Sequence, residues 1–298
     1  MTRRTPAVLF AIVTALVLEG WEHAQQSVFR SSVDLVSVDV AVRDGSTPVA
    51  GLASGDFELS DNGVKQTIDA VNIEAVPIDV MLLVDTSNSA AKALNQLKSD
   101  VQAIANVLRP IDRVELVTFD RTVREVLPVQ PPTHHLPLES MRAVGGTSLN
   151  DAVFYALTWP ADVGRRHLIV ALTDGEDTTS ATADAEVPLA ARRSEAVLEV
   201  VLFAPAVPDG MDPHPPYGSR AMLVDAAATT GGEVHQLDDA VKAFRIIFDD
   251  FRQSYVLRYA LRGVSREGWH AISVRVTRAG GEHYTIRART GYFGSNGP

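Results

Sequence analysis

The sequence of 298 residues contains no cysteine. This absence excludes disulfide bonds, cysteine-bound zinc, iron–sulfur clusters and thiol nucleophiles. Basic residues are also outnumbered, with 27 Lys and Arg against 37 Asp and Glu and a net charge of −10. A nucleic-acid-binding protein normally carries a basic stripe, whereas the basic residues here are scattered. We therefore expect no nucleic acid among the ligands, and any chemistry must use oxygen and imidazole groups.

No stretch of the sequence is apolar for long enough to span a bilayer. Residues 6–18 form an apolar run directly after Arg3 and Arg4, which suits the core of a secretory signal. We predict a signal peptide over residues 1–24 and an exported protein, periplasmic, secreted or associated with the cell envelope, with no membrane insertion after signal removal. Because Glu22 occupies a position where a small residue is preferred, a retained anchor stays open as the alternative.

Hydrophobic residues make up 46% of the chain and charged residues 21%, as in globular proteins, and the length suggests about two domains. Residues 29–75 and 252–298 both alternate apolar and polar side chains, as Val36, Val38 and Val40 illustrate. Each segment alone is too short to bury enough surface to fold. We predict that they pair into one all-β module.

Residues 76–250 have a different pattern, in which continuous apolar runs alternate with amphipathic stretches. The run at 80–84 is typical of a strand buried on both faces of a parallel sheet. The whole pattern predicts an α/β fold with a doubly wound, mostly parallel sheet. We expect strands at 80–84, 114–119, 168–172 and 197–203, helices at 90–108, 149–157, 183–194, 221–230 and 240–251, and a loop at 205–218.

Three polar segments stand at the ends of these predicted strands or the starts of helices. They are Asp-x-Ser-x-Ser at residues 85–89, Gly-Gly-Thr at 145–147 and Thr-Asp-Gly at 173–175. Open α/β sheets place their ligand crevice at the carboxyl ends of the strands, so these loops should converge. Their oxygen atoms suit a hard divalent cation, Mg²⁺ or alternatively Mn²⁺ or Ca²⁺. The predicted metal ligands are Asp85, Ser87, Ser89, Thr147 and Asp174.

These three segments resemble the metal-ion-dependent adhesion site of von Willebrand factor type A domains, over roughly residues 76–250. With the exported N-terminus and the Arg-x-Gly-Tyr-Phe segment at 289–293, the layout is similar to the VWFA-related proteins of acidobacteria. The resemblance implies that Ser87, Ser89 and Thr147 contact the metal directly, while Asp85 and Asp174 act largely through water. It also implies ligand binding without turnover, and therefore a protein that is not an enzyme.

The functional hypothesis is an adhesion-type protein that binds a Glu or Asp carboxylate of a partner protein through the metal. Only two of the predicted ligands carry charge, so the metal has reason to recruit another carboxylate. Two alternatives remain, namely a metal-assisted hydrolase with Glu176 as its only candidate base, and a scaffold whose cleft binds nothing. Glu176 and Asp177 are interpreted as a solvated acidic loop, and His134 and His135 as a surface pair.

Overall fold

The computed structural model of the protein describes residues 35–72, 76–133, 135–203, 219–236 and 240–294. All of them belong to one compact unit of the chain. The predicted signal peptide of residues 1–24, the first residues of the predicted β segment at 29–34, His134 and the whole predicted loop at 205–218 lie outside the described residues.

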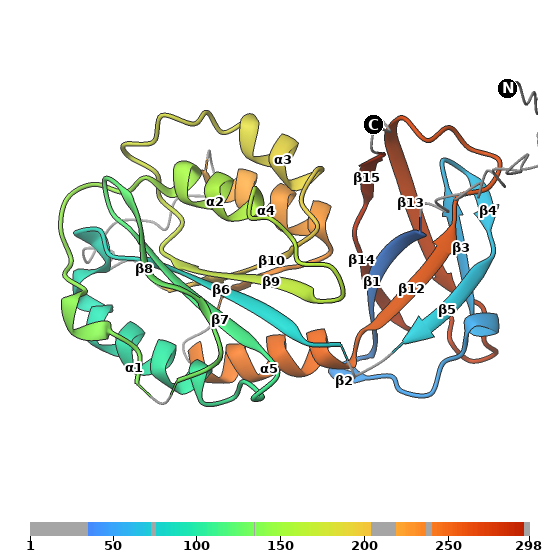
Figure 1. Cartoon of the computed structure of the whole chain (residues 1–298), viewed down its shortest axis with the longest axis horizontal. Helices are drawn as coiled ribbons and strands as arrows, with labels where there is room; N and C mark the ends of the chain where they lie inside the picture. Colours follow the sequence, from blue (N-terminus) through green and yellow to red (C-terminus); the bar gives the residue numbers. More distant parts are fainter. Residues whose placement is uncertain (1–34, 73–75, 134, 204–218, 237–239, 295–298) are drawn as a thin grey trace, which may run out of the picture. The chain divides into compact units, whose positions relative to one another are not determined.

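A six-stranded sheet lies at the centre of the α/β part of the chain, in the order β11-β10-β9-β6-β7-β8 (Figure 1). Neighbouring strands pair in parallel from β11 to β7, and only β8 runs antiparallel, as a hairpin with β7. Because parallel strands present their carboxyl ends at one edge, the loops that leave them meet there. The strands are β6 (Ile78–Asp85), β7 (Arg113–Phe119), β8 (Val123–Gln130), β9 (Arg166–Thr173), β10 (Val197–Leu202) and β11 (Val234–Gln236).

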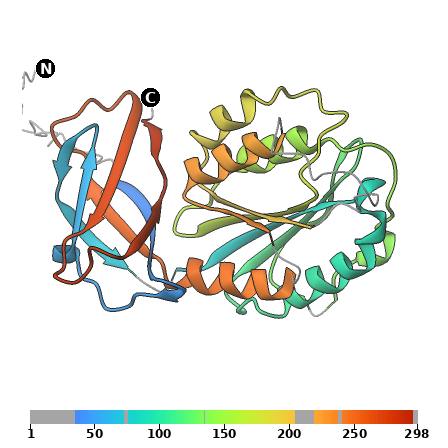
Figure 2. The same cartoon turned by 180° about the vertical axis from the view of Figure 1, so that it is seen from behind.

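Helices cover both faces of this sheet, as Figures 1 and 2 show from opposite sides. Val80, Leu82 and Val84 of β6 pack with α1 and α5, while Met81 and Leu83 pack with α2, α3 and α4. This double burial explains why β6 is apolar at almost every position. The α/β fold predicted from the sequence is thus confirmed. The helices are α1 (Leu94–Ala105), α2 (Leu149–Leu157), α3 (Glu186–Ala191), α4 (Ser219–Thr230) and α5 (Ala240–Gln253), with short 3₁₀ turns η1 (Ser54–Asp56), η2 (Ser89–Lys92) and η3 (Leu138–Ser140).

The long helix predicted at 90–108 is wrong as a single element. The structure has the turn η2 followed by α1, because the backbone N–H groups of Ala90 and Ala93 donate to the carbonyls of Ser87 and Ala90, three residues earlier. The helix predicted at 183–194 is also shorter, since α3 covers only residues 186–191. Before it, the Asp184 carboxylate accepts a hydrogen bond from the Asn150 side chain at 2.7 Å, which holds this segment against α2.

The strand β8 was not among the predicted elements. This strand contains Pro128, and its side chains are partly or fully exposed. The sequence of β8 therefore shows neither a regular alternation of apolar and polar residues nor an apolar run. Proline is tolerated at this place because β8 is the edge of the sheet. The pairing with β7 is irregular between Val114 and Leu116, as well as between Leu116 and Val117.

Strands from the two ends of the described chain share two further sheets, which we call the terminal β module. In one sheet β1 pairs with β12 and β14, and β12 also pairs with β5; in the other β13 pairs with β3 and β15, and β3 with β4. Val38, Leu59, Tyr255 and Tyr259 are buried in the core of the module. Its strands are β1 (Leu35–Asp44), β2 (Thr47–Pro48), β3 (Phe57–Asp61), β4 (Val64–Gln66), β5 (Ile68–Asn72), β12 (Tyr255–Ala260), β13 (Gly268–Val276), β14 (Thr285–Ala288) and β15 (Gly291–Gly294).

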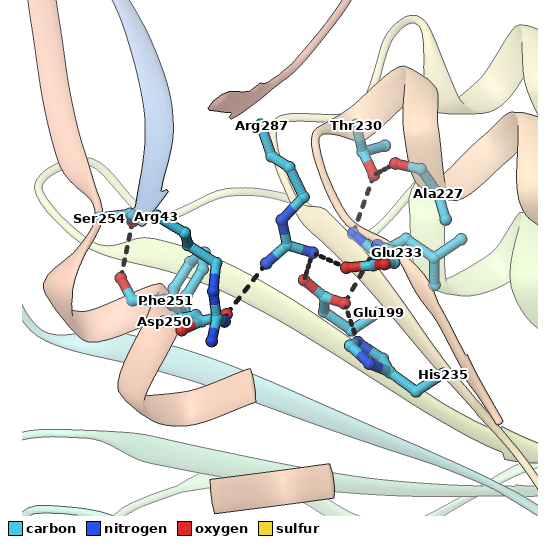
Figure 3. A network of polar contacts seen from close by, with 11 residues as sticks. Arg43, Glu199, Ala227, Thr230, Glu233, His235, Asp250, Phe251, Ser254 and Arg287 are labelled. Atoms are coloured by element: carbon cyan, nitrogen blue, oxygen red, sulfur yellow. Dashed lines mark hydrogen bonds and ion pairs between the residues drawn. The ribbon is translucent and has the colours of Figure 1, made fainter. Parts of the chain in front are cut away.

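A network of charged groups joins the terminal β module to the α/β part (Figure 3). Arg43 of β1 forms an ion pair with Asp250 of α5, and Arg287 of β14 lies 3.3 Å from the same carboxylate. Arg287 also lies 3.6 Å from Glu199 of β10, which contacts His235 of β11 at 2.7 Å. Because Glu199 and Asp250 are nearly buried, these partners supply the charge compensation that buried carboxylates require.

Candidate functional site

Asp85 is the last residue of β6 and has a fully buried side chain. One carboxylate oxygen accepts a hydrogen bond from the backbone N–H of Ser87 at 2.9 Å, and the other accepts one from the hydroxyl of Thr173 at 3.0 Å. The next residue, Thr86, donates its backbone N–H to the carbonyl of Phe119 at 2.8 Å. Asp85 is therefore fixed between the ends of β6, β7 and β9.

The two serines of the first loop lie side by side. The Oγ atoms of Ser87 and Ser89 are 2.9 Å apart, although Ser87 is buried and Ser89, at the start of η2, is exposed. Two hydroxyl oxygens at this separation offer neutral ligands to a hard cation. Because Ser87 also donates its backbone N–H to Asp85, the first loop presents these three predicted ligands as one group.

Thr147 lies two residues before the start of α2 and is almost fully buried. Its backbone N–H donates to the Thr178 hydroxyl at 2.8 Å, and its carbonyl accepts from the backbone N–H groups of Thr178 and Thr179. On the other side, the carbonyl of Gly145 accepts the N–H of Asn88 at 3.1 Å. The Gly-Gly-Thr loop is thus hydrogen-bonded to both of the other loops.

Backbone conformation and steric contacts explain why residues 145 and 146 of this loop are glycines. Gly145 has a φ angle of +74°, a conformation that other residues rarely adopt. A Cβ atom on Gly146 would lie 2.6 Å from Cγ2 of Thr179, closer than atoms can approach. A larger residue at position 146 would therefore push the Thr147 loop away from the loop after β9.

Asp174 follows β9 and is fully buried. Its Oδ1 atom accepts a hydrogen bond from the backbone N–H of Glu176 at 3.0 Å, whereas its Oδ2 atom has no hydrogen-bond partner among the residues that the structure describes. A buried oxygen of a carboxylate without a partner is costly, since burial removes the water that would solvate it. A bound cation would remove this cost.

The electrostatics of the site point in the same direction. Burial raises the pKa of the Asp85 carboxyl to about 6, and repulsion from Asp174 adds to the rise, while hydrogen bonds from Ser87 and Thr173 oppose it. Across the described residues, no three His, Asp or Glu side chains gather as metal ligands would. A cation placed here would therefore need hydroxyl ligands, and the serines and Thr147 provide that chemistry.

Not every predicted residue is connected equally. Asp85, Ser87 and Ser89 are linked directly, Asp174 is close enough to Asp85 to affect its pKa, and Thr147 is linked through its backbone. The interpretation of Asp177 as part of a solvated acidic loop is wrong. Its carboxylate accepts the backbone N–H of Asn150 at 3.0 Å, in the first turn of α2, where a negative charge is favourable.

Sequence reasoning missed three contributors to the site. Thr173 binds Asp85 through its hydroxyl, and Arg220 donates a guanidinium N–H to the carbonyl of Asp174 at 2.7 Å. Arg121 packs against Gly145. The sequence carried a signal only for Thr173, which stands next to Asp174, because the other contacts join residues far apart in the chain.

An open α/β domain with loops of hydroxyl and carboxylate groups at the carboxyl edge of its sheet defines a class of ligand-binding domains. The family model of the von Willebrand factor type A domain matches residues 80–176, from β6 to the loop after β9. The resemblance to von Willebrand factor type A domains is therefore confirmed over these residues. Domains of this family are mostly interaction modules rather than enzymes. No curated protein matches the sequence significantly.

Several solved structures are similar to this chain. A von Willebrand factor type A protein from Catenulispora acidiphila has 13% identity and a TM-score of 0.49, with 89% of this chain and 75% of that chain covered. The ArnB paralog VWA2 from Sulfolobus acidocaldarius has 12% identity and a TM-score of 0.48, with 84% and 73% covered. The manganese-loaded TRAP protein of Plasmodium vivax has 15% identity and a TM-score of 0.44, with 78% and 97% covered.

Within the part of the chain that the structure describes, no helix is both long and apolar enough to cross a bilayer.

Proposed function

We propose that the protein is an adhesion-type interaction protein that binds an acidic group of a partner through a divalent cation. The cation site consists of Asp85, Ser87, Ser89, Thr147 and Asp174. The observation that carries this proposal is the buried Oδ2 atom of Asp174. Within the described part of the chain this atom has no hydrogen-bond partner, although a second buried carboxylate, Asp85, lies near it. Such an arrangement is unfavourable without a positive charge between the carboxylates.

The ligand set favours Mg²⁺, with Mn²⁺ and Ca²⁺ as alternatives. Mg²⁺ prefers oxygen ligands and binds through one or two carboxylates together with water. Asp85 and Asp174 are the only charged ligands of this set, and their two negative charges formally balance those of a divalent ion. The three remaining ligands are neutral hydroxyls. When bound, the ion supplies a Lewis acid that can take a carboxylate oxygen from outside the protein.

The partner in this proposal is another protein that presents a Glu or Asp side chain at the site. The apolar segment at residues 6–18 supports an exported protein, so the partner would be found in the periplasm, at the cell envelope or outside the cell. The acidic net charge of −10 disfavours a nucleic acid as the partner.

A metal-assisted hydrolase in the same cleft is the alternative function. It needs a general base beside the metal-bound water. The only candidate, Glu176, is 62% exposed, and its carboxylate lies 3.9 Å from the guanidinium of Arg220. An exposed side chain held toward an arginine is poorly placed to act as that base, so the interaction protein remains the better proposal.

Calorimetric titration with Mg²⁺ tests the cation site directly. Wild-type protein should bind one ion, and Asp174→Asn should bind it much more weakly, because the variant lacks one of the two charged ligands. Asp112→Asn is the matched control, since Asp112 is also buried but pairs with Arg252 away from these loops. Equal affinities of the wild-type protein and Asp174→Asn would refute the proposed site.

A further inference from the structure

Two arginines lie against glycines of the loops that carry the predicted ligands. A Cβ atom added to Gly145 would be 3.0 Å from Cγ of Arg121, and one added to Gly175 would be 2.9 Å from Cγ of Arg220. Both glycines have positive φ angles, +74° and +82°. Only glycine combines this backbone conformation with room for the arginine side chain, so both arginines pack closely against the loops that carry the predicted ligands.

The order of the strands places these arginines on opposite sides of the two buried carboxylates. In the sheet, β10, β9, β6 and β7 are successive neighbours. Asp174 follows β9 and Asp85 ends β6, whereas Arg121 follows β7 and Arg220 lies in α4, the helix after β10. The carboxylates are therefore bracketed by one basic residue on each side.

The two arginines differ in what they bind. Arg220 donates a hydrogen bond to the carbonyl of Asp174, and its Nε atom is buried. Arg121 is exposed, and across the described residues its guanidinium has no hydrogen bond or ion pair. Arg220 thus holds the Asp174 loop, while Arg121 keeps all its donors available for a ligand, and a guanidinium matches the geometry of a carboxylate.

We propose that Arg121 binds a second carboxylate of the same partner, so that the partner offers an acidic segment rather than one acidic residue. This inference rests on the proposed function, because the first carboxylate occupies the cation site. The positive charge of Arg121 also makes this side of the site more attractive to an acidic segment than the net charge of the chain would suggest.

The test uses two blocked synthetic peptides of glycine and serine, one with a single central aspartate and one with three consecutive aspartates. NMR titrations in Mg²⁺ would give both dissociation constants for the wild-type protein, Arg121→Gln and Arg275→Gln. Arg275 is the matched control, since it is an exposed arginine of β13 that pairs with Glu58. Comparing the ratio of the two constants between proteins cancels the statistical advantage of three aspartates.

Arg121→Gln should reduce the preference for the triple-aspartate peptide by up to about fivefold, the range of an exposed ion pair. Arg275→Gln should leave it unchanged, and Arg121→Lys should restore part of it. If binding needs Mg²⁺ but the preference is the same in Arg121→Gln and wild type, this inference is overturned and the proposed function stands. If neither peptide binds the wild-type protein in a Mg²⁺-dependent way, the proposed function fails, and this inference with it.

Discussion

The substitution Asp85→Asn should separate the cost of the buried carboxylates from the stabilisation by the cation. Asparagine has the same shape and can keep a hydrogen bond with the backbone N–H of Ser87 and with the hydroxyl of Thr173. It removes the negative charge that Asp174 repels. In EDTA the variant should therefore be more stable than the wild-type protein.

The pKa of Asp85 gives the size of this gain. A carboxyl whose pKa rises from 3.8 to about 6 on folding costs about 3 kcal/mol of stability at a pH above both values. The sign follows because the folded state holds the proton more tightly, so the cost is absent at low pH and complete at pH 8. Asp85→Asn should recover up to this amount at pH 8.

Magnesium should stabilise the wild-type protein but hardly affect the Asp85→Asn variant. At a concentration one hundred times the dissociation constant, the ion stabilises the wild-type protein by about 2.7 kcal/mol. For a chain of this size, that corresponds to a rise in melting temperature of about 4–5 °C. Asp85→Asn lacks a charged ligand and should show almost none of this rise, although it starts from a higher melting temperature.

Thermal unfolding at pH 8, in EDTA and in MgCl₂ at equal ionic strength, measures both effects. Asp112→Asn serves again as the control, because it should lower the melting temperature in both buffers and retain the full Mg²⁺ increment. The reasoning is refuted if Asp85→Asn keeps the wild-type increment, or if it is strongly destabilised in EDTA.

Three further predictions concern other parts of the molecule. Burial raises the pKa of Glu115 to about 7, and repulsion from Glu125 adds to the rise. Glu115→Gln should therefore stabilise the protein by up to about 3 kcal/mol at pH 8 and hardly at all at pH 4, which denaturant unfolding at both pH values would measure. Gly146→Ala should displace Thr147, because its Cβ atom would collide with Thr179, and calorimetry should find weaker Mg²⁺ binding than in Gly55→Ala, where the added atom meets nothing within 4 Å. Truncation after Phe251 removes β12 and β14, which pair with β1, so the exposed edges of β1 should cause aggregation that light scattering detects. A soluble product whose β1 amides stay protected from exchange would contradict the shared sheets.

Parts of the fold could be predicted from the sequence because burial leaves a strong pattern. The strands β6, β9 and β10 are nearly continuous apolar runs, and α2 begins at Leu149 and ends at Leu157 as predicted. The edge strand β8 could not be found this way, since an edge strand need not be apolar and tolerates Pro128.

The surroundings of the candidate site were harder to predict than its position. The orphan oxygen of Asp174, the hydrogen bond from Arg220 and the place of Arg121 all depend on contacts between loops that the sequence does not encode locally. Asp177 was misread because an acidic residue in a loop has the same sequence pattern whether it is solvated or bound to the start of a helix.

The most direct test of the central claim is the location of a bound ion. Crystals of the protein grown with Mn²⁺ should give an anomalous difference peak among Asp85, Ser87, Ser89, Thr147 and Asp174. The ion at this peak should be coordinated by hydroxyl oxygens, and the peak should be absent from crystals of Asp174→Asn. A fully occupied peak at another place, or no peak between these loops at saturating Mn²⁺, would contradict the account.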